Sequence, residues 1–245
     1  MNTIAVYNLK GGVGKTATAV NLAYLSAHSG IKTCLWDLDP QAAASWYLSC
    51  KPKRGFKFSK LAKEKLALGN QIQTTDYDHL DMIPADLTYR KMDTQMAHAD
   101  PNRFKEWLGS LSEIYQTTIL DCPPTVSSLA EIVLKQADLV LVPALPTYLS
   151  FQTYHQLVSL MKAKKIPVKK LLPVITMIDR RKKIHCEFSD NSQMHLNKEP
   201  IGFVPYSSHV EKMGEFRQPV ASFAPRSVAA LAYQLLWDRL EEKLH

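Results

Sequence analysis

The stretch NLKGGVGKTATA, residues 8–19, nearly matches the phosphate-binding loop pattern G-x-x-x-x-G-K-[ST]. The letters GKT match the end of the pattern, whereas Leu9 stands where its first glycine belongs. Lys10 is an additional lysine directly before the two neighbouring glycines. The loop follows the strand-like run TIAVYN and opens the helical pattern KTATAVNLAYLSAH. A strand, a glycine-rich loop and a helix in this order predict a site for the phosphates of a nucleotide.

The residue types in this loop indicate its chemistry. The glycines let backbone N–H groups turn toward phosphate oxygens, and the N-terminus of the helix adds partial positive charge. Lys15 is expected to neutralise charge on the β- and γ-phosphates, and the hydroxyl of Thr16 to coordinate Mg²⁺. We therefore predict ATP and Mg²⁺ as the cofactors.

Short apolar runs alternate with helical patterns along the whole chain, and several of these runs lack polar alternation, which is typical of strands buried on both faces of a parallel sheet. Residues 15–30, 127–136, 150–164 and 227–244 have helical patterns. We predict an α/β fold of the P-loop NTPase class: one domain over residues 1–245, with a doubly wound, mostly parallel sheet flanked by helices. The predicted strands are TIAVYN (3–8), KTCLWDLD (32–39), LDMIPA (80–85), QTTILDC (116–122), DLVLVPA (138–144), LLPVITMI (171–178) and IGFVPY (201–206). Residues 51–78 and 180–200 have the weakest pattern, and we expect specific function there.

Two of the predicted strands end in aspartates. LWDLDPQ carries Asp37 and Asp39, and TTILDCPP carries Asp121 after an apolar run, in the manner of a Walker B motif. A lone aspartate at a strand end is more often a helix cap. Ligands of open α/β sheets bind outside the carboxyl ends of strands, however, where all three motifs converge. We expect Asp121 to hold Mg²⁺ directly or through water, and an aspartate near the γ-phosphate to orient the attacking water.

The motifs KGGVGKT, DLDPQ and DCPP, in this order and spacing, resemble the deviant Walker A ATPases of the ParA/MinD superfamily, specifically the ParA type of partition and positioning ATPase. The resemblance covers essentially the whole chain. It implies a homodimer around two ATP molecules, in which Lys10 reaches the other subunit's phosphates and Lys15 serves its own nucleotide. It also implies that Asp39 positions the attacking water and that Asp121 is the Walker B residue. Asp37 matches the first acid of the family's D-x-D.

The resemblance assigns a nucleotide site residue by residue. TMIDR (176–180) resembles the segment on the base side, which assigns Asp179 to adenine, and VPYSSHVEKMGEFRQPV (204–220) resembles a second base-side segment, which assigns Pro205. Many relatives have a second hydroxyl residue where this chain has Ala17, so we expect a lower nucleotide affinity. The implied phosphate contacts are Lys10, Gly11, Gly12, Val13, Gly14, Lys15, Thr16 and Ala17, and the implied metal site is Thr16, Asp39 and Asp121.

The chain is basic, with a formal net charge of +7 and a sequence pI near 9.1. Lysine and arginine gather in three runs, residues 51–65, 162–170 and 180–183. A solvated surface explains any single run, but three runs favour a polyanionic partner. Such a partner is nucleic acid or an acidic membrane surface. No RNA-binding signature or helix-turn-helix pattern is evident, so if nucleic acid is bound, we expect phosphate contacts to dominate and sequence reading to be weak. The resemblance implies that the nucleic acid is DNA, bound non-specifically. The candidate contacts are the 51–65 run and Arg180, Arg181, Lys182, Lys183, Arg217 and Arg226.

Several classes of protein are disfavoured. No apolar run reaches the roughly 18 residues that span a bilayer, and residues 1–8 lack the features of a signal peptide. The four cysteines are scattered, which disfavours disulfides, zinc and iron–sulfur clusters and favours the cytoplasm. The final segment, LAYQLLWDRLEEKLH, has Glu241 and Glu242 beside Leu240 and Leu244. We therefore expect these leucines to pack on the sheet and the segment not to bind membrane.

The first hypothesis is a cytoplasmic, nucleoid-associated positioning ATPase that binds DNA as an ATP dimer and is released by a ParB-like or other cargo adaptor. Because the phosphate loop starts at residue 10, we expect no N-terminal DNA-reading domain. A membrane-associated regulator of the MinD type and a soluble metabolic ATP-dependent enzyme are the alternatives. ATP-dependent binding to liposomes would favour the former, and turnover only with a small-molecule acceptor the latter.

Overall fold

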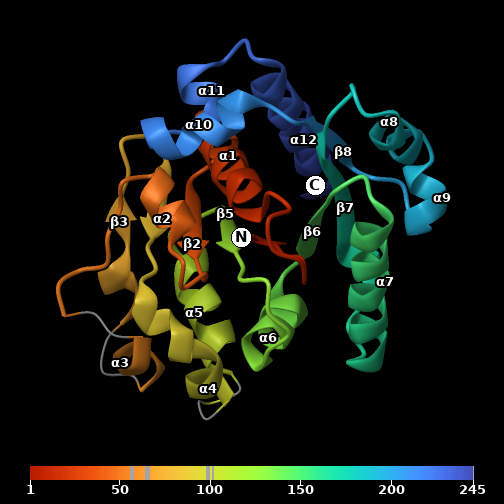
Figure 1. Ribbon diagram of the computed structural model, residues 1–245. Coiled ribbons are helices and arrows are strands. Elements are labelled where there is room, and N and C mark those ends of the chain that lie inside the picture. The colour runs from red at the N-terminus through yellow and green to blue at the C-terminus, as the bar shows by residue number, and fades with distance from the viewer. Residues whose placement is uncertain (56–57, 64–66, 98–99, 101, 245) are drawn as a thin grey trace.

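The computed structural model describes residues 1–55, 58–63, 67–97, 100 and 102–244. An eight-stranded sheet runs through its centre in the order β3-β4-β2-β5-β1-β6-β7-β8 (Figure 1). The edge strand β3 is antiparallel to β4, and the other neighbours pair in parallel. The strands are β1 (Asn2–Val6), β2 (Thr33–Asp37), β3 (Gln73–Thr74), β4 (Leu80–Ile83), β5 (Thr117–Asp121), β6 (Leu139–Ala144), β7 (Leu171–Ile178) and β8 (Gly202–Pro205).

Helices cover both faces of the sheet, and alternate residues of the strands divide between two cores. In β1, Ala5 belongs to one core, and Ile4 and Val6 belong to the other. The Ala5 face is covered by α3 (Phe58–Ala62), α4 (Met92–Ala97), α5 (Arg103–Ser112), α6 (Ser128–Gln136), α7 (Tyr148–Ala163), α8 (Lys183–Asp190) and α9 (Ser192–Leu196). The opposite face is covered by α1 (Lys15–His28), α2 (Ala43–Tyr47), α10 (Ser208–Phe216), α11 (Val220–Phe223) and α12 (Val228–Leu244). Three short 3₁₀ turns complete the described elements: η1 (Leu68–Gln71), η2 (Leu87–Lys91) and η3 (Val168–Lys170).

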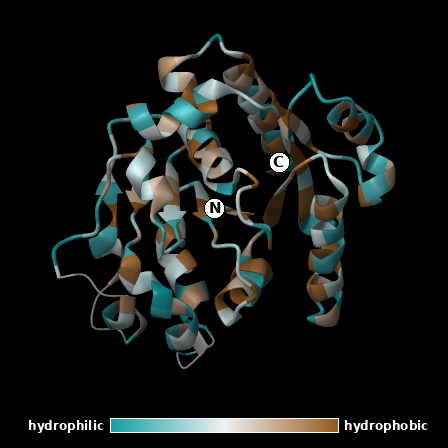
Figure 2. Cartoon of the chain, in the orientation of Figure 1, coloured by the Kyte–Doolittle hydropathy of each residue, from teal (hydrophilic) through white to brown (hydrophobic). Residues whose placement is uncertain are grey.

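The predicted fold class is confirmed. All seven predicted strands form, and β6 and β7 are hydrophobic along most of their length (Figure 2). The two-residue β3 was missed, because it lies in the weakly patterned 51–78 stretch. The helices α1, α6, α7 and α12 match the predicted patterns, whereas the short helices between them were not predicted. Helices of four to ten residues are stabilised mainly by packing, which leaves little signal in the sequence.

The final helix bears out the packing expected for Leu240 and Leu244, which both belong to or lie against the core. Leu240 is buried against β8 and α1, but Leu231 and Leu235 are exposed. With 3.6 residues per turn, Leu240 lies about 140° around the helix from Leu235. Its side chain therefore meets the sheet while the other two leucines point away from it. None of the described helices is long and apolar enough to cross a membrane.

Candidate functional site

The three motifs meet at the carboxyl edge of the sheet because their strands are neighbours in the order β2-β5-β1. In the parallel register Asp121 of β5 pairs with Asp37 of β2 on one side and with Val6 of β1 on the other. The phosphate loop follows β1 and leads into α1. The two aspartate-bearing strand ends therefore lie beside the loop, as the motifs predicted.

The phosphate loop is held in shape by polar contacts on both sides. Asn8 is buried, its Nδ2 donates to the carbonyl of Pro143 over 2.6 Å, and its Oδ1 accepts from the backbone N–H of Lys10 over 3.0 Å. On the other side the hydroxyl of Thr176 donates to the carbonyl of Val13 over 2.9 Å. Contacts from β6 and β7 thus fix the shape of the loop.

Two glycines in the loop adopt conformations that other residues avoid. Gly12 has a φ of 70° and Gly14 a φ of 85°, both in the left-handed region. Gly14 is the N-cap of α1 and has no side chain to cover the first N–H groups of the helix. These N–H groups remain available to an anion at the positive end of the helix.

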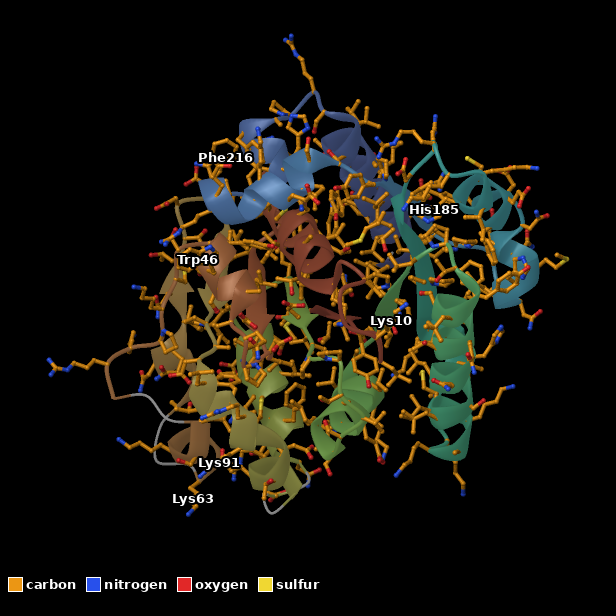
Figure 3. All side chains as sticks on the ribbon, viewed as in Figure 1. Lys10, Trp46, Lys63, Lys91, His185 and Phe216 are labelled. Atoms are coloured by element: carbon orange, nitrogen blue, oxygen red, sulfur yellow. The ribbon has the colours of Figure 1, made fainter. Side chains whose placement is uncertain are left out.

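The two lysines of the loop occupy different environments. Lys15 is buried, and its Nζ donates to the carbonyl of Lys10 over 2.9 Å. Burial lowers the pKa of Lys15, while the nearby Asp121 and Asp39 act in the opposite direction. Lys10 is half-buried, and its Nζ has no hydrogen bond or ion pair with any residue that the structure describes (Figure 3). Lys15 therefore points into the loop, and the Lys10 ammonium is left for another partner.

Asp37 shapes the loop that carries Asp39. Its carboxylate is fully buried and accepts from the backbone N–H of Asp39 (3.0 Å) and from the N–H and hydroxyl of Ser45 (2.9 and 2.7 Å). Burial raises the pKa of Asp37 to about 6, against the effect of the Ser45 hydrogen bonds. Asp39 is partly exposed, and its Oδ1 accepts from the N–H of Gln41 over 2.9 Å. Asp37 is therefore the anchor, and Asp39 is the accessible carboxylate.

Asp121 is fully buried, and neither of its oxygens has a hydrogen-bond partner among the described residues. Burial and the neighbouring Asp37 raise the pKa of Asp121. The nearby Thr16 hydroxyl acts in the opposite direction, although it forms no hydrogen bond with either oxygen of Asp121. A buried carboxylate without a partner is costly and fits a cation. In the described part of the chain no three His, Cys, Asp or Glu side chains gather as a metal cluster. A Mg²⁺ ion here would therefore use Asp121, Thr16, phosphate oxygens and water, which is its usual preference.

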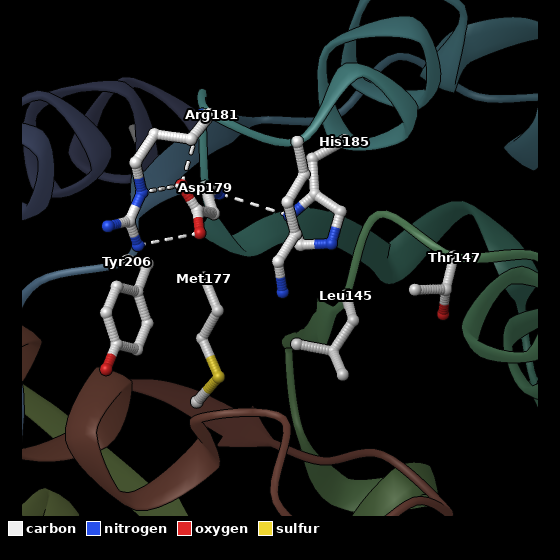
Figure 4. A pocket seen from close by; sticks show the side chains of 8 residues that line it. Leu145, Thr147, Met177, Asp179, Arg181, His185 and Tyr206 are labelled. Carbon is white, nitrogen blue, oxygen red and sulfur yellow. Dashed lines mark hydrogen bonds and ion pairs between the residues drawn. The ribbon is translucent and has the colours of Figure 1, made fainter.

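The base-side residues line two cavities. One cavity, of about 490 Å³, lies between the loops after β6 and β7. Met177, Asp179, His185 and Tyr206 are among the side chains that line it (Figure 4). The Asp179 carboxylate accepts two bonds from the Arg181 guanidinium (2.8 and 2.9 Å), and this pairing lowers the pKa of Asp179 to about 2. Asp179 thus lines the cavity with its carboxylate already engaged, and its contact with adenine stays a prediction.

A smaller cavity of about 100 Å³ lies between the phosphate loop and the start of α10. It is lined by Pro205 and also by Gly14, Ala17, Met177 and Tyr206, and a contact of Pro205 with adenine stays a prediction. Met177 has a φ of 56° at an irregularity in the pairing of β7 with β8. Met177 and Tyr206 lie within the two segments predicted to be on the base side, but the sequence did not single them out, because the bulge that turns Met177 toward Gly14 depends on β8.

The candidate DNA contacts do not form one cluster. Arg180, Arg181 and Arg226 line one groove, whereas the guanidinium of Arg217 lies 3.6 Å from the ring centre of Trp46, on α2. Of the 51–65 run, residues 56–57 and 64–65 lie outside the described residues. Lys63, which belongs to this run, lies near Lys91 (Figure 3). Both are at the opposite end of the molecule from Phe216, which directly precedes Arg217 (Figure 3). The remaining candidates, Lys182 and Lys183, are exposed at the start of α8.

Replacing Asp121 by asparagine should stabilise the nucleotide-free protein and remove its response to Mg²⁺. Burial raises the folded-state pKa values of Asp121 and Asp37 above those of the unfolded chain. The two carboxyl groups therefore lower the free energy of unfolding as the pH rises from about 4 through their folded-state pKa values. Removing the buried charge is expected to gain about 1–3 kcal/mol, or roughly 2–12 °C in melting temperature at pH 7.5. Thermal denaturation at pH 5 and pH 7.5, with and without ATP and Mg²⁺, measures this. A variant that melts below the wild type at pH 7.5 would contradict the assignment.

The chain is similar to known proteins over most of its length. Residues 1–173 match the AAA domain family. The chromosome-partitioning ATPase Soj of Thermus thermophilus is 31% identical over 97% of this chain and 94% of its own length. The chromosome partitioning protein ParA of Myxococcus xanthus is 27% identical over 98% of this chain and 88% of its own.

Solved structures agree at the level of the fold. The septum site-determining protein MinD of Pyrococcus horikoshii, complexed with Mg-ADP, superposes with a TM-score of 0.81. It is 18% identical, and the superposition covers 99% of this chain and 97% of that one. The similarity in sequence and in fold extends over almost the whole of each chain.

Proposed function

The chain belongs to the ParA/MinD superfamily of partition ATPases, and on this basis we propose that it is a positioning ATPase. In this proposal the ATP-bound protein dimerises, binds nucleoid DNA non-specifically, and leaves the DNA when a cargo adaptor stimulates hydrolysis. One observation carries the proposal. The buried Asp121 carboxylate, which has no hydrogen-bond partner among the described residues, lies in the electrostatic range of the buried Lys15 ammonium of the glycine loop. The two groups interact electrostatically but form no ion pair within 4.0 Å, so direct contact does not neutralise either charge.

The described residues supply the parts that phosphoryl transfer needs. The N–H groups of the glycine loop and the start of α1 hold phosphate oxygens, and Lys15 neutralises their charge. Asp121 and Thr16 would hold Mg²⁺, which supplies further charge neutralisation at the phosphates when bound. Asp39 keeps one carboxylate oxygen free of described partners, and this oxygen can accept a hydrogen bond from the attacking water. The buried Asp37 holds that loop in place.

Replacing Lys10 by alanine should leave ATP binding by the monomer nearly unchanged and abolish ATP-dependent dimerisation. The reason is that the Lys10 backbone carbonyl, which holds Lys15, is kept, whereas the half-buried ammonium that has no described partner is lost. Sedimentation velocity with ATP and Mg²⁺ would measure the dimer, and titration calorimetry the affinity. An ATP dimer of wild-type strength would contradict a role for Lys10 across the interface.

The experiment that tests the function is the anisotropy of a labelled random DNA duplex with ATP, with ADP and without nucleotide. The proposal expects tight binding with ATP only, a steep loss of affinity with added salt and little dependence on sequence. The double variant Lys182→Ala, Lys183→Ala should bind more weakly, because these exposed lysines follow the carboxyl end of β7. Lys162→Ala, Lys169→Ala is the matched control, since these exposed lysines precede the amino end of β7. Absence of DNA binding in every nucleotide state would refute the proposed function.

A further inference from the structure

A groove of about 960 Å³ lies between β8, the last strand of the sheet, and the outer side of α12. Figure 1 shows these two elements side by side, with the loop that follows β7 beside them. We call this feature the β8–α12 groove. Its apolar lining includes Phe203, Val228, Leu231 and Leu235, and its charged lining includes Arg180, Arg181 and Arg226.

The apolar side of the groove is unusually exposed. Val228 is 71% exposed, Leu231 55% and Leu235 60%, and Phe203 on β8 is 42% exposed. Positions 228, 231 and 235 follow a spacing of three and four residues and therefore share one face of α12. They extend about 10 Å along the helix, or two turns. Scattered apolar residues are common on surfaces, but a contiguous stripe of this kind in a groove marks an interaction site.

The charged side of the groove has an excess of positive charge. Arg181 is paired with Asp179, the acidic residue of the lining. Arg180 and Arg226 are exposed, and within the described residues neither has an ion-pair partner. The groove therefore presents an apolar stripe with two unmatched guanidinium groups beside it.

This combination selects among the possible occupants. A DNA duplex would satisfy the arginines but would leave the leucines, Val228 and Phe203 without an apolar partner. A second copy of the chain joined by a two-fold contact would bring a second set of the same arginines to the interface, which is unfavourable. A helix with apolar residues three and four positions apart and with acidic residues near them would match both halves of the groove.

We propose that the β8–α12 groove binds an acidic, amphipathic helix of a partner protein. The binding itself does not depend on ATP hydrolysis or DNA binding. In the proposed function this partner would be the cargo adaptor, and that identification rests on the proposed function. If DNA also uses Arg180 and Arg226, the helix and the duplex compete for them, so docking at this groove would weaken DNA binding.

The position of the groove links it to the nucleotide site. Pro205 and Tyr206 line both the groove and the small cavity under the phosphate loop. Asp179 and Arg181 line both the groove and the larger cavity of Figure 4. Any shift of these residues on nucleotide binding would change the groove, and by linkage the bound helix would change nucleotide affinity by the same factor.

The test uses a displayed library of random 12-residue peptides, selected on the full chain without nucleotide or DNA. The enriched peptides should combine apolar residues at helical spacing with Asp or Glu. Labelled synthetic copies should bind the double variant Leu231→Gln, Leu235→Gln roughly tenfold or more weakly. Leu149→Gln is the matched control, because Leu149 lies on α7 and is as exposed as Leu235, at 60%. Arg226→Glu should weaken the acidic peptides and restore binding to copies in which the acids are replaced by lysine.

Three results would overturn the proposal. The first is peptides that bind the double glutamine variant as well as the wild type. The second is peptides whose acids can be changed to glutamine without loss. The third is a selection that yields no groove-dependent peptide, combined with a loss of binding by the double glutamine variant to anionic phosphatidylglycerol vesicles or to random duplex DNA. The groove would then bind a membrane or DNA and not a helix. Because the selection needs neither ATP turnover nor DNA, a failure of the proposed function leaves this test intact.

Discussion

Replacing Lys15 by alanine is expected to lower the affinity for ATP by roughly 100-fold or more, which corresponds to about 3 kcal/mol. Lys15 is buried, its Nζ already donates to the Lys10 carbonyl, and no carboxylate within 4.0 Å satisfies its charge. One or two charge-assisted hydrogen bonds to phosphate would account for this loss, since each is worth about 1.5–3 kcal/mol. The aliphatic part of the side chain contributes little to a polyanion. The phosphates therefore lose their main cationic contact in the same subunit.

Titration calorimetry with ATP and Mg²⁺ measures this loss. Lys10→Ala is the natural control, because it removes the other lysine of the loop and should keep affinity near that of the wild type. Circular dichroism establishes that both variants are folded. An unchanged ATP affinity in Lys15→Ala would remove the glycine loop from the phosphate site.

Replacing Asp39 by alanine should slow ATP hydrolysis by roughly 100-fold or more while ATP binding persists, because a positioned base or water-orienting group contributes about that much. Asp39 is the accessible carboxylate at the ends of the three motif strands, since Asp37 and Asp121 are fully buried. A protein that binds ATP without hydrolysing it should remain dimeric and stay on DNA. The variant is therefore expected to dissociate from a labelled duplex much more slowly than the wild type.

Single-turnover phosphate release measures the hydrolysis rate, and anisotropy after addition of competitor DNA measures the residence time. Asp39→Asn keeps an oxygen that can accept from the Gln41 N–H, so it preserves the turn while removing the charge. It should be as slow as the alanine variant. Asp78→Ala, at an exposed site before β4, should hydrolyse ATP normally. Wild-type turnover in Asp39→Asn would exclude Asp39 as the residue that orients water.

Much of the fold and the centre of the site could be predicted because their signals are local. The phosphate loop is read from neighbouring residues, and a parallel sheet brings the carboxyl ends of its strands to one edge whatever their order. The role of Asp37 as the anchor of the Asp39 loop could not be predicted from neighbouring residues. Its partner Ser45 lies eight positions further on, and the contact forms only because the five-residue α2 turns back over the strand end.

The rest of the site depends on elements that meet only in the folded chain. Helical periodicity placed Leu231 and Leu235 on one face of α12, but it could not show that the sheet ends at β8. In the same way, a run of basic residues shows that the segment is positively charged but not which way each side chain points. Arg181 turned out to be paired with Asp179, and Arg217 to lie over Trp46.

The contact between α2 and α10 gives the protein an optical signal of its own. Trp46 is 50% exposed, its indole N–H donates to the Gly214 carbonyl over 3.1 Å and its ring lies under the Arg217 guanidinium, whereas Trp36, Trp107 and Trp237 are buried. Red-edge emission and quenching by iodide therefore come mainly from this one indole. Because α2 follows the Asp39 loop directly, movement of that loop on nucleotide binding would change the emission without any added label. The intrinsic fluorescence of the wild-type chain thus reports in real time on the segment next to Asp39.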